Sequence, residues 1–173
     1  MALTIDATVS GVDSNSYVTI DEAEEYLDYR YDNVAWANAT DDEKVIALVM
    51  ACEKIEQFSF YGVKCSTAQR LSFLRYFSDV VKTDVDNIVL YENNAVPIMP
   101  KNVKKVQILE ANEILKLKSE MASDVTTRAD LIKQGVTEVV MGENSEKYDK
   151  AGLGEWKSSD AQRLMVGIIR RGY

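Results

Sequence analysis

Residues 96–121 read VPIMPKNVKKVQILEANEILKLKSEM and carry the apolar periodicity of a long helix. Pro100 suits the first turn, where its missing N–H is not needed for a helical hydrogen bond. Apolar residues repeating at about 3.6 positions define one side: Val103, Val106, Ile114, Leu117 and Met121. Three more widen that stripe: Ile108, Leu109 and Leu115. The side expected in solvent carries Lys101, Lys105, Asn112 and Lys116. Because the helix is apolar around so much of its circumference, we expect it to be the central helix of a helical domain.

Capping boxes predict where other helices begin. Each pairs a Thr or Ser with a Glu or Gln three positions later, at Thr19–Glu22, Thr40–Glu43 and Ser159–Gln162. Together with the central stretch they predict helices over 20–31, 41–58, 100–121 and 159–170. Residues 34–36 look like a short apolar link. Residues 135–149 combine strand composition with a central turn, which predicts a small β-ribbon. We therefore expect a mainly α fold, a four-helix-type bundle with one ribbon.

Length and composition favour one domain over residues 1–173, with 46% hydrophobic residues available for its core. Residues 1–16 look like an extended N-terminal arm, and 123–157 like a ribbon and loop insertion. There is no apolar run of about 18 residues and no basic-then-apolar leader, so we expect a soluble, unsecreted protein. Cys52 and Cys65 form no metal pattern, and their spacing leaves a disulfide open without supporting it. A reducing compartment fits best.

Acidic residues are concentrated in the first third of the chain. Residues 1–60 hold 13 Asp and Glu against 3 Lys and Arg, whereas the remainder holds 15 against 17, within a net charge of −8. The simpler interpretation, and the one with more weight, is a solvated acidic helix surface. The second is a surface that repels polyanions such as nucleic acid. Under either interpretation the sequence lacks a basic patch for gripping DNA.

The chain lacks the usual signatures of catalysis. It has no histidine, no CxxC pair, no GxGxxG, no GxxxxGK[ST] and no GxSxG. We therefore expect no enzyme activity, no cofactor and no metal. Cys52 falls within an apolar helix stripe and reads as a small core residue. Glu110 falls within the apolar stripe of the central helix, where we expect either a Lys or Arg partner inside the fold or contact with a neighbouring subunit.

Aromatic residues raise a different hypothesis, binding of single-stranded nucleic acid by base stacking. Tyr29, Tyr31 and Trp36 lie close together in the sequence. Stacking platforms are normally accompanied by a cationic groove that holds the phosphates. Because the charge around these three residues is acidic, we expect them to pack in the core.

Several motifs, taken in order, resemble a tailed-phage family of head–tail adaptor (connector, head-completion) proteins. They are NSYVTIDEA at 15–23, QRLSFLR at 69–75, VPIMPKNV at 96–103 and VVMGENS at 139–145. The second resembles the family's Gln-x-Leu-x-Trp-Pro-Arg segment, with Phe73 in place of Trp and Leu74 in place of Pro. The resemblance spans nearly the whole chain, and the order of the motifs carries it. Some members are labelled DnaT-like single-stranded-DNA-binding proteins, which gives an alternative function, a replication accessory protein that binds single-stranded DNA.

The resemblance implies a structural virion protein that forms a homo-oligomeric ring, typically of about twelve copies. The ring would dock under the portal protein, extend the DNA channel and receive a stopper or tail-completion protein. Genomic double-stranded DNA would pass through without sequence-specific binding, and no membrane would be involved. The location would be the head–tail interface of the virion, and the host cytoplasm during assembly. Family members dock through a C-terminal segment, here 164–173, with the expected contact residues Leu164, Met165, Ile168, Ile169, Arg170, Arg171 and Tyr173.

Overall fold

The computed structural model describes residues 3–76, 99–122, 138–141, 144–147, 156–165 and 169. Within these ranges the fold is mainly α, with two small antiparallel pairs of strands. The helices are α1 (Ile20–Leu27), α2 (Val34–Ala37), α3 (Asp41–Glu56), α4 (Lys101–Ala122) and α6 (Ser159–Met165). The strands are β1 (Val63–Lys64), β2 (Arg75–Tyr76), β3 (Glu138–Met141) and β4 (Asn144–Lys147).

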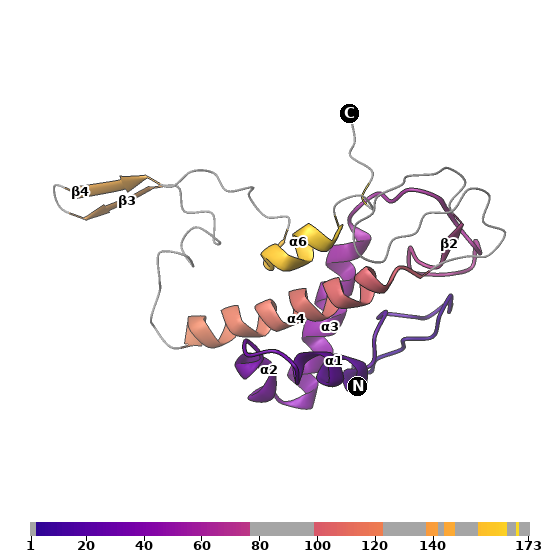
Figure 1. Ribbon diagram of the computed structural model, residues 1–173, viewed down its shortest axis with the longest axis horizontal. Helices are drawn as coiled ribbons and strands as arrows, with labels where there is room; N and C mark the ends of the chain where they lie inside the picture. Colours follow the sequence, from indigo (N-terminus) through magenta and orange to yellow (C-terminus); the bar gives the residue numbers. More distant parts are fainter. Residues whose placement is uncertain are drawn as a thin grey trace.

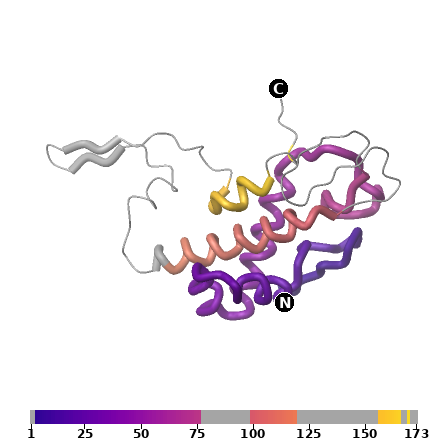
Figure 2. The backbone as a smooth tube through the Cα atoms, viewed as in Figure 1, coloured from indigo at the N-terminus to yellow at the C-terminus, as the bar shows by residue number. Residues whose placement is uncertain are grey.

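Helix α4 lies at the centre of the described structure. It contacts α1, α2, α3 and α6, so the central position predicted from its wide apolar girth is confirmed. In Figure 1 α3 crosses α4, with α6 on one side of α4 and α1 and α2 on the other; Figure 2 shows the same path as a tube. One prediction about this helix is wrong. Asn112 is buried rather than solvated, and its Nδ2 donates to the carbonyl oxygen of Asp32 at 2.9 Å.

Two helix starts agree with their capping boxes. The hydroxyl of Thr19 accepts from the N–H of Glu22, whose carboxylate accepts in return from the Thr19 N–H, and Thr40 and Glu43 repeat this exchange. The third start differs by one residue. The hydroxyl that accepts from the Ala161 N–H belongs to Ser158, so Ser158 rather than Ser159 caps α6.

Helix ends depart further from the prediction. Helix α1 stops at Leu27 instead of 31 and α3 at Glu56 instead of 58, while the link at 34–36 is itself the short helix α2. Ile169 pairs with Phe60 in an isolated antiparallel bridge, so the last helix does not continue to 170 as expected. The predicted ribbon is present as β3 and β4, paired from Glu138 with Lys147 to Met141 with Asn144.

Among the described residues, the buried side chains form two core clusters. The first core cluster joins α3, α4 and α6, and includes Tyr17, Cys52, Ile55, Phe60, Phe73, Val103, Val106, Leu109 and Met165. The second core cluster joins α1, α2, α3 and α4, and includes Val18, Leu27, Trp36, Ala47, Leu48, Ile108, Ala111 and Leu115. Helix α4 supplies both clusters from different sides, which explains its apolar girth.

Residues 3–16, predicted as an extended arm, fold back on themselves and on the segment before β2. The N–H groups of Asn15 and Ser16 donate to the carbonyl oxygen of Asp6, and the Gly11 carbonyl oxygen accepts from the Arg70 N–H at 3.1 Å. Strand β1 pairs with β2 through Val63 with Tyr76 and Lys64 with Arg75. The peptide bond between Phe73 and Leu74 is cis.

Candidate functional site

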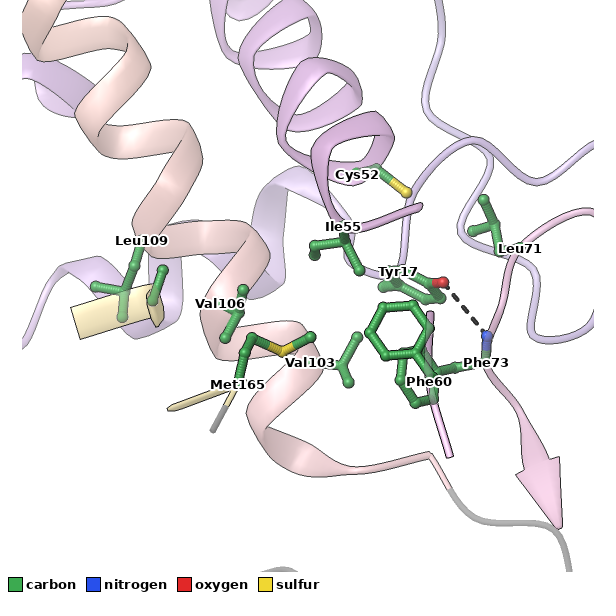
Figure 3. Close-up of a cluster of buried hydrophobic side chains, with 11 residues drawn as sticks. Tyr17, Cys52, Ile55, Phe60, Leu71, Phe73, Val103, Val106, Leu109 and Met165 are labelled. Atoms are coloured by element: carbon green, nitrogen blue, oxygen red, sulfur yellow. Dashed lines mark hydrogen bonds between the residues drawn. The ribbon is translucent and has the colours of Figure 1, made fainter. Parts of the chain in front are cut away.

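A polar network lies beside the first core cluster and joins two of the motifs. The hydroxyl of Tyr17 donates to a carboxylate oxygen of Glu56 and accepts from the Phe73 N–H at 3.3 Å (Figure 3). Glu56 also accepts from the N–H and the hydroxyl of Ser72, at 3.0 and 2.9 Å. Burial, together with the nearby Glu56 carboxylate, raises the pKa of the Tyr17 phenol. The hydroxyl therefore stays protonated and acts as a fixed donor.

Two further residues of the 69–75 motif are used inside the fold. The amide of Gln69 donates to the carbonyl oxygens of Leu71 and Leu74, and its oxygen accepts from the Ser66 N–H. The guanidinium of Arg75 is buried and donates to four carbonyl oxygens, those of Phe60, Tyr61, Gly62 and Ser72. These bonds satisfy backbone groups of a segment without regular structure. Arg75 is thus unavailable for a phosphate.

The first motif is tied to α4 by Gln107, which the sequence analysis missed. Its Nε2 donates to the Ser16 hydroxyl at 2.7 Å and to the Leu48 carbonyl oxygen at 2.9 Å, and its Oε1 accepts from the Tyr17 N–H at 2.9 Å. The available signal was a polar residue inside an apolar stripe, because Gln107 lies one turn from Val103 and one from Glu110.

Glu110 is bonded inside the fold. Its carboxylate accepts from the N–H of Lys157, at 2.8 and 3.0 Å, and from the N–H of Ser158, at 2.9 Å, just before α6. The hydrogen-bond partners given for the carboxylate are therefore backbone groups, and the cations Lys54 and Lys157 lie near enough to act on it electrostatically. Burial raises the pKa of Glu110, and these two N–H groups, together with the positive charges of Lys54 and Lys157, oppose that shift. The residue holds the start of α6 against α4.

The expected C-terminal contact residues are only partly described. Met165 is fully buried in the first core cluster, and Leu164 and Ile169 pack against it partly buried. Ile168, Arg170, Arg171 and Tyr173 lie outside the described residues. The described members of this set thus contribute to the chain's own core.

The aromatic group at 29–36 divides between surface and core. Trp36 is buried as expected, but the prediction was wrong for Tyr29 and Tyr31, which are exposed almost completely. Arg30, between them, forms ion pairs with Asp32 at 2.9 Å and Asp160 at 3.3 Å. The charge environment is acidic, and its nearest cation is already paired.

Acidic residues of α1 and α3 pair with lysines across the helices. Glu22 contacts Lys104 and Glu24 contacts Lys44, each at 2.6 Å, and Glu43 contacts Lys118. Cys52 is buried, and burial raises the pKa of its thiol to about 12, as suits a core residue. Within the described ranges, no three His, Cys, Asp or Glu side chains gather as a metal site requires. None of the described helices is long and apolar enough to cross a membrane.

Comparison with known protein families shows which family the chain belongs to. A sequence model of the family described as "Putative DnaT-like ssDNA binding protein" matches residues 1–170. The chain belongs to this DnaT-like family. No curated protein and no solved structure matches it. The matched residues include all four motifs. In the described structure, the first two motifs supply buried, hydrogen-bonded residues.

Proposed function

We propose that the chain is a structural virion protein, a subunit of a head–tail adaptor ring in a tailed phage. The ring, of about twelve copies, docks under the portal protein, extends the DNA channel and receives the stopper or tail. It acts through protein interfaces, without enzymatic activity or cofactor, and lets genomic DNA pass without reading its sequence. The segment 164–173 contributes to portal docking through residues other than Met165, which is fully buried in the first core cluster. The subunit is a four-helix-type bundle around α4.

Exposed apolar side chains, grouped on separate parts of the surface, are the observation that carries this proposal. Ile46 and Met50 lie one turn apart on α3, and Val63 and Tyr76 face each other across β1 and β2. Isolated exposed apolar residues are common, but such pairs favour contacts with other proteins. A ring subunit needs at least two such surfaces, because each copy contacts a neighbour on both sides.

Charge supports a channel that does not grip DNA. Several acidic residues of the first third are exposed, among them Asp21, Glu25 and Asp28, while Lys44, Lys104 and Lys118 are held in ion pairs. Phosphate contacts need free lysines and arginines, and affinity grows with their number. A surface of this composition repels a passing duplex.

The motif residues also support a structural role. Tyr17, Gln69 and Arg75 are buried and bonded to backbone groups, so the motifs maintain a rigid body rather than a reactive site. A ring that transmits contacts between two partners requires such rigidity.

Co-expression with the portal protein of the same phage tests the proposal. We expect a ring of this chain seated on the portal, visible by electron microscopy. The double variant Ile46→Glu, Met50→Glu should weaken this assembly by at least about tenfold, since it places charge in an apolar contact. Ser59→Glu, an exposed position with no described partner, serves as the control. A chain that stays monomeric beside its portal contradicts the proposal.

A second candidate function is single-stranded-DNA binding, which the family description and the exposure of Tyr29 and Tyr31 favour. Two exposed aromatic rings could stack on bases. The test is anisotropy of a labelled oligonucleotide across salt concentrations. This function requires binding that falls with salt and is lost in Tyr29→Ala, Tyr31→Ala but kept in Tyr61→Ala. Absence of binding at low salt rejects it.

A further inference from the structure

An open groove of about 450 Å³ lies between α2 and the C-terminal half of α4. Its apolar lining comes from Val34, Ala35 and Ala39 on one wall and Leu115 on the other. Val34 is 63% exposed although it lines this groove. A concave apolar surface of this size accommodates one or two large side chains.

The rim of this groove carries both signs of charge, lysines on the α4 side and acids toward the start of α3. Glu43 and Asp32 lie on its edge, and Asp41 and Asp42 follow in the exposed first turn of α3. Residues 28–43 hold five acidic residues and one arginine. Lys116 and Lys118 line the α4 side, where Lys118 pairs with Glu43 and Lys116 with Glu113, and Asp32 pairs with Arg30. The acidic side of the groove is therefore the exposed first turn of α3, at Asp41 and Asp42. An apolar floor with an acidic helix turn along one side fits an apolar knob that carries cations on the matching side.

The β1–β2 ribbon has the complementary character. Val63 is 68% exposed and its cross-strand partner Tyr76 is 37% exposed, so the pair forms an apolar knob. Residues 61–76 contain three cations, Lys64, Arg70 and Arg75, and no acidic residue. Arg75 is buried, but Arg70 is exposed and Lys64 half-buried beside the knob.

Strand β2 lies beyond the N-terminal end of α4 (Figure 1), whereas the groove is lined by residues 115–119 of the C-terminal half of α4. The α4 residues at the groove begin with Leu115, which is roughly 20 Å along the helix from the first residue, Lys101. The ribbon of one copy therefore lies far from its own groove. Two complementary surfaces at opposite ends of a molecule produce a head-to-tail contact, which closes into a ring when the rotation allows.

We infer that the β1–β2 ribbon of one copy docks into the α2–α4 groove of the next copy, with Val63 and Tyr76 as the inserted side chains. Lys64 and Arg70 then face the acidic first turn of α3 in the neighbour. The inference deepens the proposed adaptor function, because it names the contact between ring subunits. It also stands by itself, since it concerns self-association of the chain.

Sedimentation velocity of the full chain over a concentration series tests the contact without a portal. Val63→Asp places a charge in the knob, and Ala39→Trp fills the groove. Each should weaken self-association by at least about tenfold. Leu3→Asp, an exposed apolar residue outside both surfaces, is the matched control and should behave as wild type. Circular dichroism checks that each variant is folded.

A charge-reversal pair provides a test that unfolding cannot imitate. The variant Asp41→Lys, Asp42→Lys makes the groove edge basic, and Lys64→Glu, Arg70→Glu makes the knob surround acidic. Each variant alone should lose self-association, because both of its surfaces then carry the same sign. Mixed together, the two variants should associate again. The basic groove edge of the first variant then meets the acidic knob of the second, and the acidic groove edge of the second meets the basic knob of the first.

The same variants on the portal separate the two proposals. Rings that form equally well with wild type, Val63→Asp and Ala39→Trp would overturn the inference and leave the adaptor function intact. Self-association through ribbon and groove, without any assembly on the portal, would overturn the adaptor function and support the inference. The inference would also be overturned if the chain does not self-associate either alone or on the portal. The same holds if the mixture of the two charge-reversed variants does not associate.

Discussion

Buried and half-buried polar side chains hold the irregular segments of this protein in place. Glu56, Gln69, Gln107 and Glu110 each accept from backbone N–H groups, in every case but Gln69 from a segment distant in the sequence. Segments outside helices and sheets leave backbone groups that need partners when buried. A side chain on a helix, such as α3 or α4, provides a rigid partner. At the residue scale, stability therefore depends on these acceptors and donors.

Tyr17→Phe should lower the free energy of unfolding by about 1–3 kcal/mol. The substitution removes the hydroxyl that accepts from the buried Phe73 N–H and donates to Glu56, and keeps the ring that packs edge-on against Phe73. Urea denaturation measures the change. Tyr29→Phe, at an exposed site, is the control and should leave stability unchanged; an equal effect of both would refute the role of the network.

Glu110→Gln should change how stability depends on pH. Because burial raises the pKa of Glu110 above 4.5, the folded chain binds this proton more tightly than the unfolded chain. The contribution of Glu110 to the free energy of unfolding is then largest at pH values below the pKa of this residue in the unfolded chain. It falls as the pH rises from that pKa to the higher pKa of the folded chain. Denaturation at several pH values should show this fall as the difference between wild type and Glu110→Gln. A constant difference across that range would contradict it.

The starts of α1 and α3 are set by short-range chemistry. The boxes at Thr19 and Thr40 satisfy N–H groups within one turn, and Asp21, Glu22 and Asp41 to Glu43 lie where the helix dipole favours anions. The start of α6 is different, since Glu110 of α4 holds the N–H groups of Lys157 and Ser158. This tertiary contact accounts for the one-residue shift of the cap from Ser159 to Ser158.

Thr40→Ala should lower the free energy of unfolding by about 1 kcal/mol. The change removes the acceptor for the Glu43 N–H at the first turn of α3, the helix that supplies both core clusters. Thermal and urea denaturation measure the effect. Thr67→Ala, an exposed loop position, should change stability by less than about 0.5 kcal/mol. If Thr40→Ala lowers the free energy of unfolding no more than Thr67→Ala does, packing alone holds α3 in place.

At the scale of the whole molecule, α3 and α4 connect the two core clusters. Ile55 and Leu48 belong to different clusters but to the same helix, and Val106 and Ile108 repeat this on α4. Because one rigid helix cannot lose half of its packing without disturbing the rest, we expect the described body to unfold as one unit. Leu48→Ala and Ile55→Ala should each cost about 2–5 kcal/mol, since both side chains are fully buried.

The two tryptophans allow a direct test of this cooperativity. Trp36 lies in the second core cluster, and Trp156 stacks on Phe58 beside the first. Trp36→Phe leaves fluorescence from the first cluster alone, and Trp156→Phe leaves fluorescence from the second. In each variant the fluorescence transition in urea should have the same midpoint as the circular dichroism transition. Separate midpoints within one variant would show that the clusters unfold independently.

Local pattern alone determined the mainly α class, the starts of α1 and α3, the central place of α4 and the position of the β3–β4 ribbon. These features depend on periodicity, capping and turn residues, which act over a few positions of the chain. Only the tertiary structure decided what the polar residues of α4 contact, since Gln107, Glu110 and Asn112 take their partners from segments far away. It also placed Tyr29 and Tyr31 on the surface and opened the groove beside α2. Burial and pairing depend on which distant segments meet, and periodicity along one helix does not record that.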